Sequence, residues 1–216
     1  MTDGSGPRDW IEWHRGYEDA TTQLARRLAI VQERVAQAIE ERGTARIRVL
    51  SMCSGEGRDL IEPVARLGAA DRIRGRLVEL DPTLAGRARE AIRATGIDGL
   101  EVREGDAGVT TSYEGAAPAD LVLVCGVFGN ITGGDIQHTI RALPSLCAEG
   151  ATVIWTRHRR PPDLTPTIRR WFRAAGFRHE GFVEVPDSTG SVGVERFVGM
   201  PAPFVPETRL FAFVDA

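Results

Sequence analysis

The stretch Ile47-Arg-Val-Leu-Ser-Met-Cys-Ser-Gly-Glu-Gly-Arg-Asp-Leu60 combines a short apolar strand with a glycine turn. Gly55 and Gly57 have no Cβ atom, so the turn can adopt positive φ angles and a ligand can approach its backbone. The helix expected next, entered through Asp59 as its N-cap, directs free N–H groups at the same point. The stretch therefore predicts the first strand and the ligand-binding loop of an α/β domain.

Strands and helices alternate after this loop, which predicts a parallel sheet. The expected strands cover residues 76–80, 100–103, 119–125 and 151–156, and the expected helices cover residues 60–67, 83–95, 135–146 and 165–175. Three strand-like stretches then follow without a helix between them, at residues 177–185, 192–198 and 209–214. A terminal hairpin needs two strands, so one of the three is an added edge strand or no strand.

The N-terminal residues 1–45 are expected to form a helical lid or extension of a domain that covers residues 46–216. Apolar residues recur between Thr21 and Arg42 at helical spacing, so this helix should pack on the domain rather than take part in chemistry. Before it come four ring side chains, Trp10, Trp13, His14 and Tyr17. They either fix the extension to the domain or close over a bound small molecule.

The composition excludes several classes of function. Every one of the 27 basic residues is Arg, which excludes Schiff-base chemistry and the lysine of a P-loop. The net charge of −3 disfavours a general nucleic-acid binder. Three scattered Cys suit neither a disulfide framework nor a zinc site, so no metal is expected. Without a membrane-length apolar run or a leader, we expect a cytoplasmic protein, monomeric or homodimeric, that binds no membrane.

Ligands of an open parallel sheet bind beyond the carboxyl ends of the strands, where the strand order reverses. The segments expected there are Ser51–Gly57, Glu79, Asp106, Cys125–Asn130 and Thr156–Arg160. Glu79 follows Gly55 at the spacing typical of a carboxylate that binds a ribose diol. A glycine turn with such a carboxylate predicts a nucleoside ligand.

The motifs distinguish between two kinds of nucleoside ligand. Leu60 stands where a dinucleotide fingerprint needs a third small residue. The segment Val49–Gly57 resembles instead motif I of the class I S-adenosylmethionine-dependent methyltransferases. Over residues 46 to about 160, Leu77–Pro82, Gly105–Ala107 and Asp120–Ile131 resemble the second, third and fourth motifs. The resemblance implies a Rossmann-like, seven-stranded, mostly parallel sheet with helices on both faces, antiparallel C-terminal strands and an added N-terminal helical segment.

The resemblance also implies S-adenosyl-L-methionine as the cofactor, with Glu79 on the ribose and Asp106 and Ala107 beside the adenine. The full set of implied cofactor residues is Ser51, Cys53, Gly55, Gly57, Asp59, Glu79, Leu80, Asp106, Ala107, Cys125 and Gly126. Two positions depart from the family pattern, which has an acidic residue at Ser51 and a glycine at Cys53. The methionine ammonium would then be held by backbone carbonyls near Cys53 and Cys125 or by Asp59.

The acceptor side is less defined by the sequence. His14, Asn130 and His158 are the catalytic candidates, and Trp13, Tyr17 and Arg157 are the substrate candidates. The run Thr156–Arg160 is either a solvated basic loop or a pocket for an acidic substrate. Without the Asn/Asp-Pro-Pro-Tyr signature or a recognition domain, a small-molecule O- or N-methyltransferase is the first choice.

Two other functions stay open at this point. A non-catalytic S-adenosylmethionine- or nucleoside-binding protein is compatible with the altered positions Ser51 and Cys53. An NAD(P)-dependent oxidoreductase is less compatible, because of Leu60 and because the chain has no Tyr-x-x-x-Lys pair.

Overall fold

The computed structural model describes residues 15–17, 19 and 21–214. Seven strands form one sheet in the order β3-β2-β1-β4-β5-β7-β6. Their bounds are β1 Ile47–Met52, β2 Ile73–Glu79, β3 Leu100–Glu104, β4 Ala119–Val124, β5 Cys147–His158, β6 Phe177–Glu184 and β7 Gly190–Phe197. The first five strands pair in parallel, and β7 pairs antiparallel with both β5 and β6. The predicted mostly parallel sheet with an antiparallel end is confirmed.

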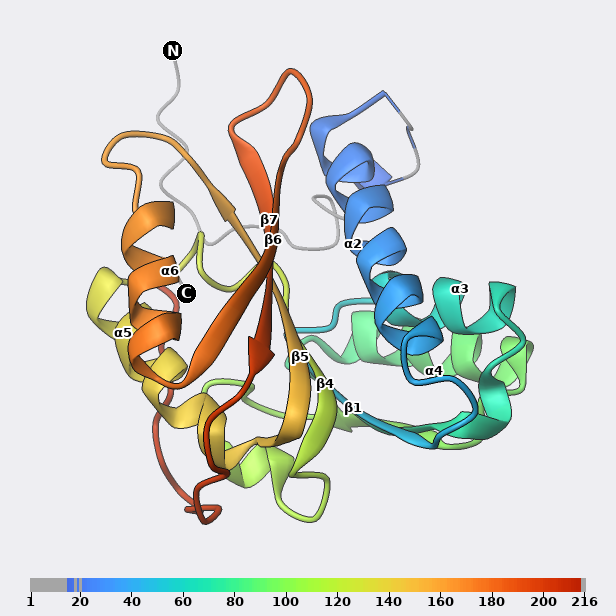
Figure 1. Ribbon diagram of the computed structural model, residues 1–216. Coiled ribbons are helices and arrows are strands. Elements are labelled where there is room, and N and C mark those ends of the chain that lie inside the picture. Colours follow the sequence, from blue (N-terminus) through green and yellow to red (C-terminus); the bar gives the residue numbers. More distant parts are fainter. Residues whose placement is uncertain (1–14, 18, 20, 215–216) are drawn as a thin grey trace.

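Helices cover both faces of this sheet (Figure 1). On one face lie α2 Gln23–Glu40, α3 Arg58–Arg66 and α4 Pro82–Thr95, and on the other lie α5 Gly133–Ala142 and α6 Thr165–Ala174. Short 3-10 turns occupy Arg15–Tyr17, Ala70–Arg72, Thr110–Tyr113 and Leu143–Ser145. Strand β4 shows why both layers are needed, because Leu121 and Leu123 join one buried cluster while Val122 and Val124 join the other.

Of the three C-terminal stretches predicted as strands, two form a hairpin and the third is not a strand. Strands β6 and β7 form the hairpin. The stretch predicted as a strand at residues 209–214 makes only isolated bridges, from Arg209 to Val109 and from Phe213 to Ile131. Leu210 and Phe211 are nevertheless buried in the core. The segment has the apolar spacing of a strand, but it packs against α5 and the turn after β3: the Thr139 hydroxyl donates to the Leu210 carbonyl at 3.0 Å, and the Leu210 amide donates to the Gly108 carbonyl at 2.7 Å.

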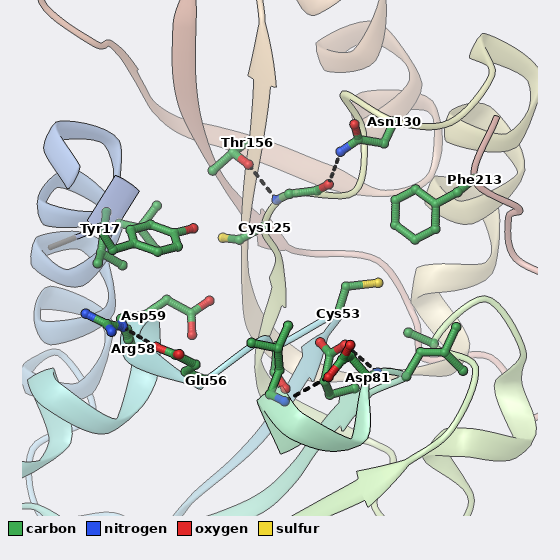
Figure 2. Close-up of a pocket in the computed structure, with 18 of the residues that line it drawn as sticks. Tyr17, Cys53, Glu56, Arg58, Asp59, Asp81, Cys125, Asn130, Thr156 and Phe213 are labelled. Atoms are coloured by element: carbon green, nitrogen blue, oxygen red, sulfur yellow. Dashed lines mark hydrogen bonds and ion pairs between the residues drawn. The ribbon is translucent and has the colours of Figure 1, made fainter. Parts of the chain in front are cut away.

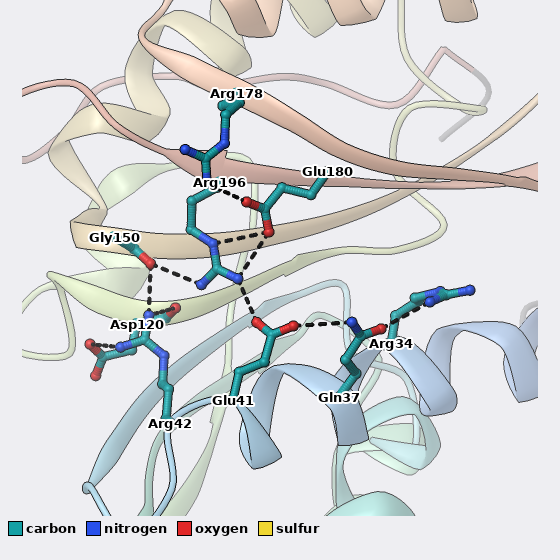
Figure 3. A network of polar contacts seen from close by, with 9 residues as sticks. All are labelled: Arg34, Gln37, Glu41, Arg42, Asp120, Gly150, Arg178, Glu180 and Arg196. Atoms are coloured by element: carbon teal, nitrogen blue, oxygen red, sulfur yellow. Dashed lines mark hydrogen bonds and ion pairs between the residues drawn. The ribbon is translucent and has the colours of Figure 1, made fainter.

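Helix α2 is fixed at its C-terminal end by a polar network (Figure 3). Arg196 of β7 binds Glu41 at 2.6 Å and Glu180 of β6 at 3.0 Å. Arg42 binds Asp120 of β4 at 3.0 Å. These contacts lie at the end of the sheet where the parallel strands begin. The division of the chain at residue 45 stays a prediction, although Val31, Val35 and Ile39 of α2 belong to a core cluster that also contains Val49 of β1.

No helix within the described part of the chain is both long enough and apolar enough to cross a membrane.

The pairing of β5 with β7 depends on a glycine, which gives a stability prediction. Gly193 lies opposite Trp155, and a Cβ atom there would come within 2.2 Å of the indole. We expect Gly193→Ala to lower the free energy of unfolding by about 1–3 kcal/mol, through overpacking of a buried ring. Gly181→Ala is the matched control in β6, since its nearest side-chain atom is 4.0 Å away. Equal urea midpoints for the two variants would contradict this assignment.

Candidate ligand-binding site

The loop after β1 is held in an unusual backbone conformation. Cys53, Gly55 and Gly57 have φ angles of 52°, 55° and 73°, all in the left-handed region. Cys53 thus takes a conformation that glycine adopts more easily, which explains why the related motif has glycine at this position. At Gly57 a Cβ atom would lie 2.7 Å from both Ile61 and Leu77, so helix α3 starts in close contact with the sheet.

Glu79, at the end of β2, ties this loop to the second strand. Its carboxylate accepts hydrogen bonds from the amide of Gly55 at 2.7 Å and from the amide of Asp81 at 2.9 Å. The side chain is only 8% exposed. Two backbone donors fix the carboxylate at the edge of a cavity, and its remaining lone pairs can accept hydrogen bonds from a ligand hydroxyl.

A cavity of about 440 Å³ lies beyond the ends of β1, β2 and β4. This is the point where the strand order reverses, as expected for the ligand site of such a sheet. Of the predicted cofactor residues, the cavity is lined by Cys53, Asp59, Glu79, Leu80, Asp106, Ala107, Cys125 and Gly126. Its charged lining residues are five carboxylates, Glu56, Asp59, Glu79, Asp81 and Asp106, against the two cations Arg27 and Arg58.

Asp59 is not the N-cap of α3, contrary to the sequence-based expectation. The N-cap is Gly57, whose left-handed φ angle turns the chain into the helix, and Asp59 lies in the first turn. Burial raises the pKa of Asp59 to about 7, while hydrogen bonds from backbone amides and the charge of Arg27 act to lower it. Its Oδ1 atom is buried and has no hydrogen-bond partner among the described residues. A buried oxygen of this kind can accept a hydrogen bond from a cationic ligand.

Tyr17 lies on the same side of the cavity as this carboxyl group, and Cys125 lines the cavity beside them (Figure 2). Burial raises the pKa of Tyr17 to about 12, and burial also raises the pKa of the Cys125 thiol. The Arg58 guanidinium lies over the Tyr17 ring at 5.9 Å from its centroid. Tyr17 is thus the described member of the N-terminal ring cluster that reaches the site. Trp13 and His14 lie outside the described residues.

The corner after β4 is shaped by two side chains. Asn130 donates from Nδ2 to the Gly126 carbonyl at 2.6 Å, and the Thr156 hydroxyl accepts from the Gly126 amide at 2.8 Å (Figure 2). Both side chains line the cavity. Their contacts hold Gly126 in its positive φ angle of 76° and so direct the backbone after Cys125 toward the ligand space.

Asp106 and Ala107 form the wall after β3. Asp106 accepts from the Gly108 amide at 2.7 Å and pairs with Arg209 at 2.5 Å, and its side chain is 47% exposed. Ala107 is buried. Phe213 covers the same side of the cavity and packs edge-on against Phe211 at 5.8 Å.

A second cavity of about 380 Å³ adjoins the first and shares Arg27, Gly126, Asn130 and Thr156 with it. Arg157 and His158, at the end of β5, line this second cavity. Arg157 donates a hydrogen bond to the Phe128 carbonyl. His158 accepts at Nδ1 from the Arg160 amide at 3.3 Å, so the neutral ring carries its proton on Nε2. For His158 to act as a general base through Nδ1, the hydrogen bond from the Arg160 amide must first break.

Three predicted cofactor residues support the cavity without lining it. Ser51 is buried within β1, and its hydroxyl has no hydrogen-bond partner among the described residues. Gly55 and Gly57 shape the loop beneath the ligand space. Several residues were missed because only the fold brings them to the site: Arg27, Leu28 and Val31 of α2, Phe213 and the turn at residues 188–190. Glu56 lies in the predicted segment Ser51–Gly57, and Arg58 follows it directly.

Helix α2 therefore lines the site in addition to packing on the sheet, whereas its apolar spacing predicted only the packing. No cluster of three or more His, Cys, Asp or Glu side chains within the described ranges is arranged to hold a metal ion.

Several solved structures with a similar fold are named methyltransferases. An O-methyltransferase family protein from Burkholderia thailandensis matches with a TM-score of 0.61 at 20% identity, over 91% of this chain and 65% of that chain. Magnesium protoporphyrin IX methyltransferase (ChlM) from Synechocystis with bound SAM matches with a TM-score of 0.66 at 15% identity, over 87% of this chain and 90% of that chain. An RNA methyltransferase from Salinibacter ruber in complex with S-adenosyl-L-homocysteine matches with a TM-score of 0.51 at 19% identity, over 79% of this chain and 95% of that chain.

No protein-family model and no curated protein matches the sequence. The chain spans about two thirds of the Burkholderia protein. At these identities the likeness concerns the fold, and the chain has the fold of the class I S-adenosylmethionine-dependent methyltransferases.

Proposed function

We propose that the chain is an S-adenosylmethionine-dependent methyltransferase that acts on a small molecule at oxygen or nitrogen. The observation that carries this proposal is the acidic cavity at the reversal point of the sheet, lined by Glu79 and by Asp59, whose Oδ1 atom has no hydrogen-bond partner among the described residues. S-Adenosylmethionine has positive charges on its sulfonium and its ammonium and one negative charge on its carboxylate, so its net charge is positive and an excess of carboxylates complements it.

The residues present fit this cofactor. Glu79 would accept hydrogen bonds from the ribose hydroxyls, and Asp106 with Ala107 would flank the adenine. Asp59, whose Oδ1 has no partner within the described part of the chain, would accept from the methionine ammonium. This assignment supplies the acidic contact that the sequence lacks at Ser51.

When bound, S-adenosylmethionine supplies an electrophilic methyl group, to which an acceptor lone pair bonds while the pair of the broken C–S bond stays on sulfur. The chain contributes position and exclusion of water. Asn130 fixes the Gly126 carbonyl at the wall between the two cavities, which makes it a positioning residue for the transfer. His14 and His158 stay predictions as proton acceptors.

A small acceptor is supported by the second cavity, which has the dimensions of a small-molecule site. The net charge of −3 argues against a nucleic-acid acceptor such as that of the Salinibacter enzyme. We extend the proposal to the N-terminal segment, where residues 1–45 would act as a lid or extension and Tyr17 would contact the acceptor together with Trp13.

Two alternatives have distinct consequences. A protein that binds the cofactor without turnover would bind S-adenosylmethionine and form no S-adenosylhomocysteine with any acceptor. An NAD(P)-dependent oxidoreductase is disfavoured by the strand order, in which antiparallel β7 lies between β5 and β6 instead of the sixth parallel strand of a dinucleotide fold.

The role of Glu79 can be tested by calorimetric titration with S-adenosylmethionine and, separately, with NADH. We expect S-adenosylmethionine alone to bind, and Glu79→Ala to weaken it by about 10- to 100-fold, the range for lost hydrogen bonds to a charged group. Glu104→Ala is the control, because Glu104 ends the next strand and pairs with Arg89 away from the cavity. Binding of NADH only, or equal affinities for wild type and Glu79→Ala, would refute the proposal.

The raised pKa of Asp59 predicts how cofactor binding depends on pH. With a pKa of about 7, against an ordinary value of 3.8, Asp59 is mostly neutral at pH 5.5 and ionises as the pH rises through 7. The ammonium binds the carboxylate more strongly than the carboxylic acid, so affinity should increase about tenfold between pH 5.5 and 7.5.

Asp59→Asn should remove this pH dependence in the same titrations. Asp71→Asn, which changes an exposed carboxylate in the turn Ala70–Arg72, should keep it. A flat profile for wild type would show that Asp59 does not hold the ammonium.

A further inference from the structure

The second cavity differs from the first in charge. Its ionisable lining residues are Arg27, Arg157, Arg160 and His158, and no Asp or Glu is among the described residues that line it. The first cavity has five carboxylates and two arginines in its lining. The site therefore changes sign across the wall formed by Gly126, Asn130 and Thr156, which both cavities share.

The cations of the second cavity come from two elements far apart in the sequence. Arg27 belongs to α2, whereas Arg157 and Arg160 belong to the end of β5 and the segment after it. The Nε atom of Arg157 is buried and has no partner among the described residues. Burial lowers the pKa of His158, repulsion from the charges of Arg157 and Arg160 lowers it further, and the charge of Asp163 acts to raise it. A bound anion would offset this repulsion.

The basic run at the end of β5 is thus not simply a solvated loop. Arg157, His158 and Arg160 line the cavity, whereas Arg159 is outside its lining and pairs with Glu184 at 2.9 Å. In the neutral ring of His158, Nε2 is a donor, because Nδ1 accepts from the Arg160 amide. Donors with no acid among the lining residues suit a ligand that only accepts hydrogen bonds.

The opposite wall is the turn between β6 and β7. The Ser188 hydroxyl donates to Gln23 Oε1 at 2.9 Å, which joins this turn to the start of α2. Both residues line the cavity. The cavity therefore has walls on several sides, and its volume of about 380 Å³ suits a small molecule.

We infer that the second cavity binds the methyl acceptor through a carboxylate or phosphate group, held by Arg27, Arg157 and Arg160, with the rest of the acceptor directed over the shared wall toward the first cavity. That the bound molecule is the methyl acceptor rests on the proposed methyltransferase function. That the cavity binds an anion does not depend on that function.

The test uses three matched compounds, benzoate, phenyl phosphate and benzamide, titrated into the full chain with and without S-adenosylhomocysteine and followed by ligand-observed NMR. We expect at least one anion to bind at millimolar concentration and to bind about tenfold more tightly than neutral benzamide. Comparison of benzoate with phenyl phosphate shows which anion the cavity prefers.

Arg160→Gln should weaken binding of the anion about fivefold or more and leave the affinity for benzamide unchanged. Arg93→Gln, which removes the same charge from an exposed position in α4, is the control for general electrostatics and should bind the anion as wild type does. Equal binding of benzamide and both anions, equal effects of the two substitutions, or no binding of either anion would overturn the inference. Failure of S-adenosylhomocysteine to bind, with anion binding retained, would instead refute the proposed function.

Discussion

The hydrogen bond from the Gly55 amide to the Glu79 carboxylate, 2.7 Å long, is the contact on which the site depends. It joins the ends of β1 and β2, and the bond from the Ser54 amide to the Val78 carbonyl at 3.0 Å reinforces the junction. With the loop fixed there, Gly57 can begin α3 against the sheet, and α3 in turn carries Asp59 to the edge of the cavity. A carboxylate that organises the loop in this way is already desolvated and oriented before any ligand arrives, which lowers the cost of binding.

The two cavities form one site with opposite charges at its ends. Carboxylates surround the space assigned to the cofactor, and arginines surround the space assigned to the acceptor. Such an arrangement favours two ligands of opposite charge in a defined orientation, since either ligand would meet repulsion in the other cavity. Arg27 lines both cavities, so α2 contributes to the boundary between the acidic cavity and the basic cavity.

Alternation of apolar strands and helices was enough to predict the sheet, and the sheet in turn placed Glu79, Asp106, Cys125 and Asn130, because parallel strands bring their carboxyl ends to one edge. Local sequence patterns gave the wrong prediction where tertiary contacts determine the structure. Asp59 has the residue type of an N-cap, but Gly57 performs that role through its φ angle of 73°. The stretch at residues 209–214 has the pattern of a strand but packs across the domain. Arg27 and the turn at Ser188 could not be assigned from the sequence, since their proximity depends on how α2 meets the β6–β7 hairpin.

The two ends of α2 are held by contacts of different strength. At the C-terminal end, Arg196 and Arg42 make partly buried ion pairs with Glu41 and Asp120. At the N-terminal end, Arg26 meets Asp187 at 3.4 Å, and that carboxylate is 90% exposed, so the pair contributes little. A hydrogen bond from the Ser188 hydroxyl to Gln23 also holds this end, and the N-terminal half of the helix lies beside both cavities. The proposed cofactor and acceptor would therefore share one wall, so a substitution at Arg27 would alter the surroundings of both ligands at once.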